Sequence, residues 1–219
     1  MFTKKPISIE NDIFDFLGET DNEYLKSFDE LANDKKGNVT LETEIFKNLC
    51  EMLVSKKGKV VDIGCGEGYI LNGLTGYRVG VDSSKLRLGC LDNDIIKVRA
   101  NVENLPFQDE YFDTAICTDV FEHVENEKML ADELYRILTP KGILCLAVPW
   151  KQDLSVYELP EFKKRWKSYI CRHRRSVNRD MIVKNFKKFR IQNETMIITA
   201  ARFMKYTPYS IKFMQFIKK

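Results

Sequence analysis

A glycine-rich turn followed by an acidic residue is the pattern in this chain with the clearest chemistry. Residues 60–68 read Val-Val-Asp-Ile-Gly-Cys-Gly-Glu-Gly, and a second apolar run ends at Asp82 after an expected helix. Glycine lets the backbone turn tightly and approach a ligand, and a carboxylate at a strand end can accept hydrogen bonds from both ribose hydroxyls. The pattern therefore predicts a βαβ unit that binds a nucleoside.

The spacing of the glycines indicates which kind of nucleoside ligand the turn can bind. Dinucleotide-binding turns read G-x-G-x-x-G and hold a pyrophosphate at a helix N-terminus. Here the spacing is G-x-G-x-G, and Glu67 adds a negative charge inside the turn. A ligand without phosphates is less sensitive to that charge, so the turn favours such a ligand.

Further blocks follow the turn and together resemble a known family. Residues 100–107 read Ala-Asn-Val-Glu-Asn-Leu-Pro-Phe, and later blocks lie at 112–113, 120–124, 133–138 and 142–149. In order and spacing, residues 58–150 resemble the class I S-adenosylmethionine-dependent methyltransferases, of the compact kind called type 11. The resemblance implies an enzyme with S-adenosyl-L-methionine as its cofactor.

The resemblance also assigns the cofactor contacts. It implies that the glycine turn faces the methionine part, that Asp62 receives the ammonium group through water, and that Asp82 binds the ribose. Asn101 stands where the family usually has aspartate, and its amide oxygen can accept the same bond from the adenine amine. The residues expected to bind the cofactor are Asp62, Gly64, Cys65, Gly66, Gly68, Asp82, Ser83, Asn101, Val102 and Thr118.

Two histidines are the candidates for a general base. His123 follows the fourth expected strand at the cofactor face, where it either accepts a proton or holds a turn. His173 lies in the run Arg-His-Arg-Arg, which either lines the acceptor pocket or is a basic surface. The residues expected to contact the methyl acceptor are Asp119, Trp150 and Arg175.

The composition of the chain argues against several other classes of protein. The 219 residues, 44% hydrophobic and 31% charged, suit one α/β domain of a globular protein. No apolar run reaches the length of a membrane span, and no signal peptide is recognised, so we expect a cytoplasmic protein. The six cysteines form no C-x-x-C pair and there are only two histidines, so no metal site is expected.

Charge is distributed unevenly. Residues 151–219 hold 18 lysines and arginines against 5 acidic residues, whereas residues 1–150 hold 17 against 27. The basic third indicates an anionic acceptor, a membrane surface or a nucleic acid, or else a solvated basic face.

The elements that must position these residues alternate between strand and helix. Strands are expected at 59–63, 77–82, 95–100, 113–118, 143–148, 188–193 and 196–203, and helices at 40–55, 127–138 and 179–186. This alternation predicts an α/β fold, a Rossmann-like doubly wound sheet with helices on both faces. The resemblance adds that the sheet has seven mostly parallel strands, the last of them antiparallel.

The chain is expected to divide into three parts. Residues 1–40 are interpreted as part of a lid on the acceptor pocket, and residues 41–204 as the methyltransferase domain, with an insert at 150–177 that lines the acceptor site. Residues 205–219 form a basic aromatic tail that packs on the domain, contacts a second subunit or lies on a membrane.

The favoured function is methyl transfer to a small molecule or to a glycan or lipid intermediate. The alternatives are an RNA methyltransferase and a cofactor-binding partner subunit without activity of its own. Fold alone does not identify the acceptor.

Overall fold

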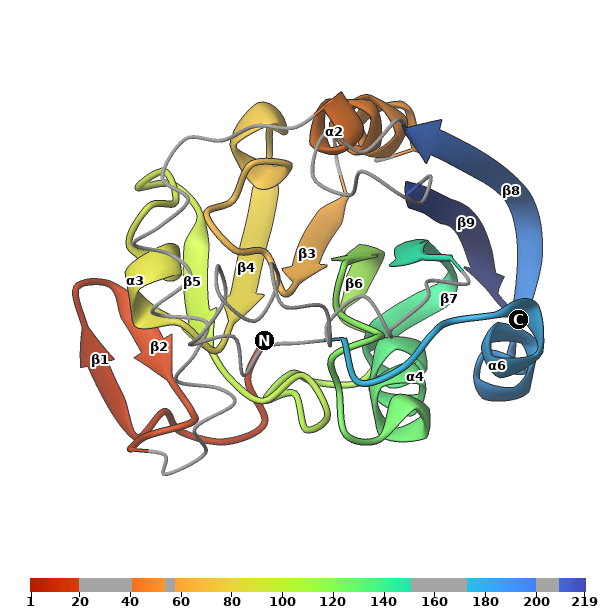
Figure 1. Cartoon of the computed structure of the whole chain (residues 1–219). Coiled ribbons are helices and arrows are strands. Elements are labelled where there is room, and N and C mark those ends of the chain that lie inside the picture. Colours follow the sequence, from red (N-terminus) through yellow and green to blue (C-terminus); the bar gives the residue numbers. More distant parts are fainter. Residues whose placement is uncertain (20–40, 54–57, 151–172, 200–208) are drawn as a thin grey trace.

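A nine-stranded sheet forms the centre of the protein (Figure 1). The structure is a computed structural model that describes residues 1–19, 41–53, 58–150, 173–199 and 209–219. The strands are β1 (Ser8–Glu10), β2 (Ile13–Asp15), β3 (Lys59–Ile63), β4 (Tyr77–Asp82), β5 (Ile96–Arg99), β6 (Phe112–Thr118), β7 (Leu138–Pro149), β8 (Phe189–Thr199) and β9 (Tyr209–Lys218). The helices are α2 (Leu41–Leu53), α3 (Lys85–Leu88), α4 (Glu127–Ile137) and α6 (Arg179–Asn185), with a 3-10 turn, η1 (Leu71–Gly73).

The sheet has the predicted doubly wound topology. Its strand order is β1-β2-β5-β4-β3-β6-β7-β9-β8, and the neighbours from β2 to β7 are parallel. The last strand, β9, is antiparallel to both β7 and β8. The α/β fold class is therefore confirmed, and the N-terminal hairpin β1–β2 adds two strands to the seven expected.

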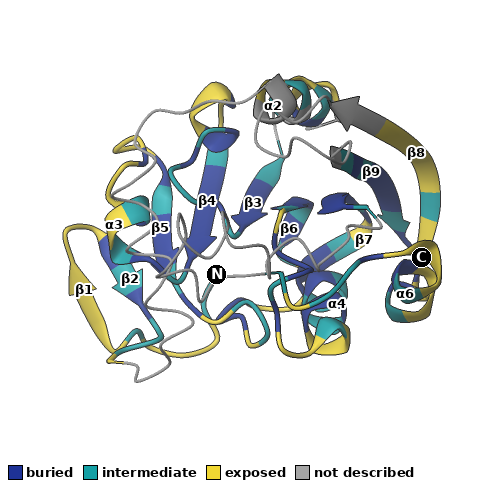
Figure 2. Cartoon of the chain, in the orientation of Figure 1, coloured by how far each residue is buried: buried dark blue, intermediate teal, exposed yellow. Residues whose placement is uncertain are grey.

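Two apolar cores cover the two faces of the sheet. On one face, Val61 and Ile63 of β3 pack in the same core as Leu134 of α4 and Ile182 of α6. On the other face, Val60 packs with residues of α2, η1 and α3. Figure 2 shows the central strands as the most buried part of the fold. Consecutive residues of β3 are buried on opposite faces, so the strand is buried from Val60 to Ile63, as central parallel strands usually are, although it includes the carboxylate of Asp62.

The prediction of a helix between β3 and β4 is wrong. Among the described residues, only the 3-10 turn η1 lies there. The Arg78 guanidinium reaches back from β4 and donates to the carbonyls of Leu71 and Leu74, at 3.0 and 2.8 Å. These bonds satisfy the carbonyls at the end of a short helical turn, so the segment does not need a longer helix.

The strands in the C-terminal part of the chain also differ from the prediction. The strands expected at 188–193 and 196–203 are one strand, β8, with an irregularity between Ile191 and Asn193. Asn193, a residue typical of turns, instead donates to Gln215 of β9 at 2.7 Å.

Residues 209–218, assigned to a tail outside the domain, form β9 between β7 and β8. The apolar residues of β9 imitate helical spacing because the strand is buried on both faces. Ile211 and Phe213 enter one core, and Met214 and Phe216 enter the other.

The first residues pack against the segment before β6, and the β1–β2 hairpin that follows them forms the edge of the sheet opposite β8. The ring of Phe2 stacks on Phe107, with centroids 5.8 Å apart, and the Thr3 amide donates to the Pro106 carbonyl at 2.8 Å. The buried Asp15 accepts a hydrogen bond from Arg99 at 3.0 Å, which fixes β2 beside β5. Within the lid expected at residues 1–40, the described residues 1–19 include β1 and β2 of the sheet, and residues 20–40 lie outside the described residues. No helix in the described part of the chain is long and apolar enough to cross a membrane.

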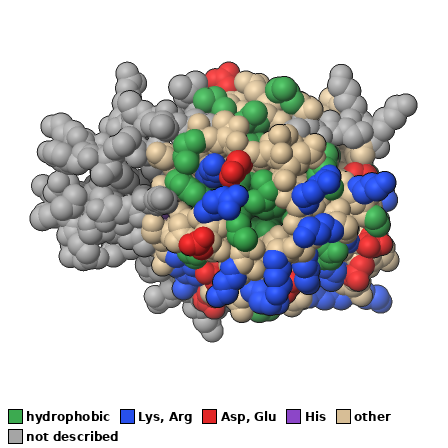
Figure 3. Space-filling view, turned by 90° about the vertical axis from the view of Figure 1, so that its right-hand side faces the viewer, with side chains coloured by type: hydrophobic (Ala, Val, Ile, Leu, Met, Phe, Trp, Pro, Cys, Tyr) green, Lys and Arg blue, Asp and Glu red, His purple; other side chains and the backbone are tan. Residues whose placement is uncertain are grey.

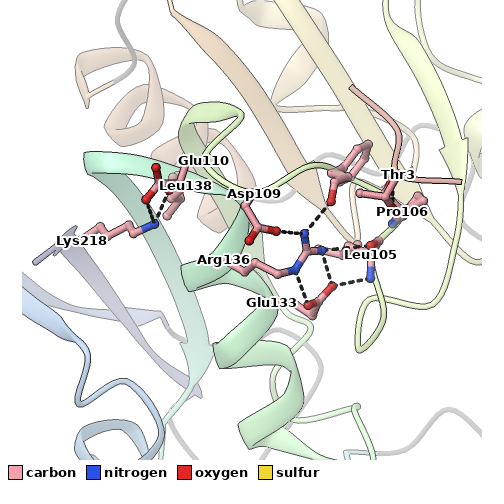
Figure 4. A network of polar contacts seen from close by, with 10 residues as sticks. Thr3, Leu105, Pro106, Asp109, Glu110, Glu133, Arg136, Leu138 and Lys218 are labelled. Atoms are coloured by element: carbon pink, nitrogen blue, oxygen red, sulfur yellow. Dashed lines mark hydrogen bonds and ion pairs between the residues drawn. The ribbon is translucent and has the colours of Figure 1, made fainter.

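A single arginine joins α4 to the segment between β5 and β6 (Figure 4). Arg136 contacts both carboxylate oxygens of Glu133, at 2.7 and 2.8 Å, and donates to Asp109 and to the carbonyls of Leu105 and Phe107. The Glu133 carboxylate beside it raises the pKa of Arg136 above its usual value. Such bidentate, charge-assisted bonds are among the stronger polar contacts in proteins.

Replacement of Arg136 by alanine should destabilise the protein by about 2 kcal/mol or more, because it leaves buried acceptors without a donor. Urea unfolding measures the change. As a control, Arg179→Ala on α6 removes an exposed arginine that lies 3.9 Å from Glu194 and should cost about 0.5 kcal/mol or less. Equal losses in the two variants would contradict the structural role of Arg136.

Candidate functional site

A cavity lies at the carboxyl ends of β3, β4, β5 and β6, where parallel strands of a doubly wound sheet meet. In the part of the chain that the structure describes, it is lined by Gly64, Asp82, Ser83, Arg87, Ala100, Asn101, Val102, Glu103, Asp119, Val120, His123, Val124, Glu125 and Arg174. The fold thus gathers residues from the segments after four strands, together with Arg174 from the segment before α6, at one place.

The glycine turn has a shape that other residues cannot adopt. Gly64 has φ +74°, and a Cβ there would lie 2.2 Å from Cγ2 of Val120. Gly66 has φ +54°, and its amide donates to Oδ2 of Asp82 at 2.9 Å. Both positions have left-handed backbone, which glycine adopts without strain. The turn therefore lets the loops after β3 and β6 come into contact.

Two other residues of the turn lie behind it. The Gly68 amide donates to the Cys65 carbonyl at 2.9 Å, which closes the turn. Cys65 is buried, and its Sγ would lie 2.9 Å from a Cβ at Gly80 of β4. Gly66, Gly68 and Cys65 are therefore next to the cavity but not on its wall.

Asp82 is held in place by backbone amides. Besides the bond from Gly66, its Oδ1 accepts from the Ser84 amide at 2.9 Å. Burial raises the pKa of Asp82, and Arg87 and these amides oppose the rise. The Ser83 amide is a further donor to this carboxylate, whose two oxygens together offer about four acceptor sites.

Asp62 is a second buried carboxylate near the cavity. It is 2% exposed, and within the described residues its Oδ1 has no hydrogen-bond partner. Burial, and then the charge of Asp82, raise its pKa to about 8. A cation near these two aspartates would favour their ionised forms.

The loop after β5 forms the wall opposite the glycine turn. The Asn101 side-chain oxygen accepts from the Glu103 amide at 2.9 Å, so one of its two lone pairs is already used. Glu103 in turn accepts from the amides of Glu125 and Asn126, at 2.7 and 3.2 Å. These bonds tie the loop to the start of α4.

The loop after β6 contributes Asp119 and His123. Asp119 is exposed and has φ +53°, a left-handed conformation that is uncommon outside glycine. The His123 amide donates to the Val120 carbonyl at 2.9 Å in a tight turn, and the side chain lines the cavity. Thr118 ends β6 beside them but is not on the wall.

Three expected site residues lie elsewhere. Arg175 donates to the Phe121 carbonyl at 3.0 Å and pairs with Glu127 at 3.3 Å, so it holds the loop after β6 and does not line the cavity. Trp150 follows β7, and its ring lies 5.7 Å from the Lys212 ammonium. His173 packs edge-on against His123, with ring centroids 4.9 Å apart, and burial lowers its pKa to about 4.

Sequence reasoning missed several residues of the wall. Arg87 follows Asp82 on α3, and Arg174 adjoins the expected His173, but neither belongs to a motif that marks a site. Val120, Val124, Glu103 and Glu125 lie in or beside the resemblance blocks and were assigned no contact. Most of the insert at 150–177 lies outside the described residues.

Known proteins resemble the central part of this chain in sequence. A family described as "Methyltransferase domain" matches residues 61–146. A protein of Methanocaldococcus jannaschii is 34% identical over 120 residues, 52% of this chain and 53% of that protein. The ubiquinone biosynthesis O-methyltransferase of Rickettsia bellii is 32% identical over 41% of each chain, and the tRNA U34 carboxymethyltransferase of a Sulfurovum strain is 30% identical over 48% of this chain and 39% of its own.

Solved structures share the fold. The protein solved in complex with the Haloferax volcanii Trm112 methyltransferase activator superposes with a TM-score of 0.68 at 16% identity, over 89% of this chain and 97% of that one. The chain spans about half the length, or less, of the curated relatives described above.

Replacement of Asp62 by asparagine should stabilise the ligand-free protein. In the unfolded chain this carboxyl ionises near its usual pKa of 3.8, but in the folded protein only near 8. Stability therefore falls as the pH rises between these values, and the variant avoids that loss. We expect a gain on the order of 1–3 kcal/mol at pH 8 and a smaller one at pH 5, measured by urea unfolding.

Asp132→Asn is the matched control. Lys128 and Lys188 hold the pKa of Asp132 below its usual value, so its loss should not stabilise the protein at either pH. A gain from Asp62→Asn that is the same at both pH values would contradict the burial of its charge.

Proposed function

We propose that the chain is a class I S-adenosylmethionine-dependent methyltransferase that methylates a small molecule or a glycan or lipid intermediate. The observation that carries the proposal is the cavity that brings together the glycine turn, Asp82 and the Asn101 loop. These are the positions at which the family resemblance places the cofactor.

The residues present fit the cofactor of this family. The Asp82 carboxylate lines the cavity and can accept from a ribose hydroxyl, and the buried Oδ1 of Asp62 needs a donor or a cation near it. Gly64 keeps the space beside Val120 clear of a Cβ. The second lone pair of the Asn101 amide oxygen can accept from an adenine amine.

The charge of the wall also suits this cofactor. Asp82, Glu103, Asp119 and Glu125 outnumber the basic residues Arg87 and Arg174 on it. An acidic wall attracts a ligand that carries a sulfonium and an ammonium group. The two arginines can receive a carboxylate, either of the cofactor or of an acceptor.

When bound, S-adenosylmethionine supplies a methyl group already activated on a sulfonium. The chain then has to hold the acceptor in line and exclude water. Asp119 and His123 face the cavity on the loop after β6. We assign them to positioning the acceptor and, for a hydroxyl acceptor, His123 to accepting its proton.

A basic surface favours a second candidate function. Figure 3 shows lysines and arginines gathered on the face formed by α6 and β8. Exposed basic residues there include Arg179, Lys184, Lys187, Lys188 and Arg190. A relative is a tRNA carboxymethyltransferase, so methylation of RNA is the alternative.

RNA binding can be tested by its dependence on salt. Binding of unfractionated tRNA that weakens about tenfold or more between 50 and 200 mM salt would favour the RNA methyltransferase. Absence of tRNA binding at 50 mM salt would favour the small-molecule, glycan or lipid acceptor.

A non-catalytic role with a partner is a third candidate. A structural neighbour was solved in complex with a methyltransferase activator, which is the observation that supports this role. Methyl transfer by the isolated chain would exclude it.

Cofactor binding tests the proposal directly. Titration with S-adenosylmethionine in a calorimeter should give saturable binding, and NAD should give none. Asp82→Ala should weaken binding by about ten- to a hundredfold, because two charge-assisted hydrogen bonds to the ribose are lost. Asp92→Ala, which removes an exposed carboxylate near α3, is the control and should bind normally. Equal affinity in wild type and Asp82→Ala would overturn the ribose assignment.

A further inference from the structure

Glu122 is buried, and its carboxylate has no hydrogen-bond partner within the described residues. The residue is 0% exposed. Buried carboxylates are normally paired, hydrogen-bonded or bound to a metal. The proposed methyl transfer gives Glu122 no role, because it lies behind the cavity wall.

Both histidines of the chain lie beside this carboxylate. The Nε2 atoms of His123 and His173 are 3.9 and 3.8 Å from Oε1 of Glu122. One ligand atom from each of the three residues lies within 4.8 Å of the others. These separations are long for direct hydrogen bonds but leave room for an ion between the three groups.

The backbone around the cluster is fixed by long-range contacts. The Arg174 amide donates to the Glu122 carbonyl at 2.9 Å, which holds the segment after His173 against the loop after β6. The Arg175 guanidinium donates to the Phe121 carbonyl at 3.0 Å. The cluster is therefore built by two segments that are far apart in the sequence.

We propose that Glu122, His123 and His173 bind one divalent transition-metal ion. Two imidazoles and a carboxylate are a donor set for Zn²⁺, Fe²⁺ or Co²⁺, whereas Mg²⁺ and Ca²⁺ prefer oxygen alone. Bonds of about 2.0–2.2 Å to a tetrahedral ion put the donor atoms about 3.4 Å apart. Each Nε2 would therefore approach Oε1 of Glu122 by roughly 0.5 Å, and the two imidazoles, within 4.8 Å of each other, would approach by up to about 1.4 Å. Small rotations of the three side chains achieve this.

The ion would balance the buried charge of Glu122 and lie at the edge of the cavity, since His123 belongs to both. No metal site was expected from the sequence because the chain has only two histidines and no C-x-x-C pair. Binding of the ion does not require methyl transfer, so its test is separate from that of the proposed function.

The test is a titration of the chelator-treated protein with Co²⁺, followed by its visible absorption, and a repeat with Zn²⁺ in a calorimeter. The wild-type protein should bind one Co²⁺ ion in the first titration and one Zn²⁺ ion in the second. His173→Ala and Glu122→Gln should each weaken binding by about tenfold or more. The control Glu194→Gln removes a carboxylate on β8 and should bind as wild type does.

A second readout guards against variants that misfold. Saturating Zn²⁺ should raise the Tm of wild type and of Glu194→Gln but not that of Glu122→Gln, which should itself be at least as stable as metal-free wild type. No saturable binding by wild type, or equal binding by His173→Ala, would overturn the proposal. So would a strong thiolate-to-cobalt charge-transfer band, which would assign the ion to a cysteine such as the exposed Cys90.

Discussion

The hydrogen bond from the Gly66 amide to Asp82 connects the architecture of the sheet to the candidate site. Parallel pairing places Ile63 opposite Val81, so β3 and β4 end at the same level. The chain leaving β3 must then turn sharply, and the carboxylate at the end of β4 holds that turn. The same carboxylate faces the cavity. One residue therefore fixes the shape of the glycine loop and presents a ligand group, and the two roles cannot be separated by mutation alone.

Three buried carboxylates lie in and next to the candidate site. Asp62, Asp82 and Glu122 are all buried, and burial is the largest influence raising the pKa of each. Such groups lower the stability of the ligand-free fold, and functional sites commonly carry this cost. The cationic cofactor would stabilise Asp62 and Asp82, and the proposed metal ion would stabilise Glu122. We infer that the protein gains stability when these ligands bind.

Local sequence predicted the parts of the site that local structure builds. The glycine turn, the ends of β3 and β4 and the loop after β5 each lie in one short segment, so their residue types and spacing determine them. The positions of Arg175 and His173 were harder to predict because they depend on contacts with Phe121 and Glu122, which are distant in the sequence. Strand β9 was misread for a related reason, since burial on both faces removes the alternation that marks a strand.

A crystal structure with S-adenosylhomocysteine bound would test the central claim most directly. The account predicts ligand density in the cavity, with both ribose hydroxyls on Asp82, the adenine beside Asn101 and Val102, and the amino acid part near Gly64. Density at another surface, or a ribose that does not contact Asp82, would contradict it.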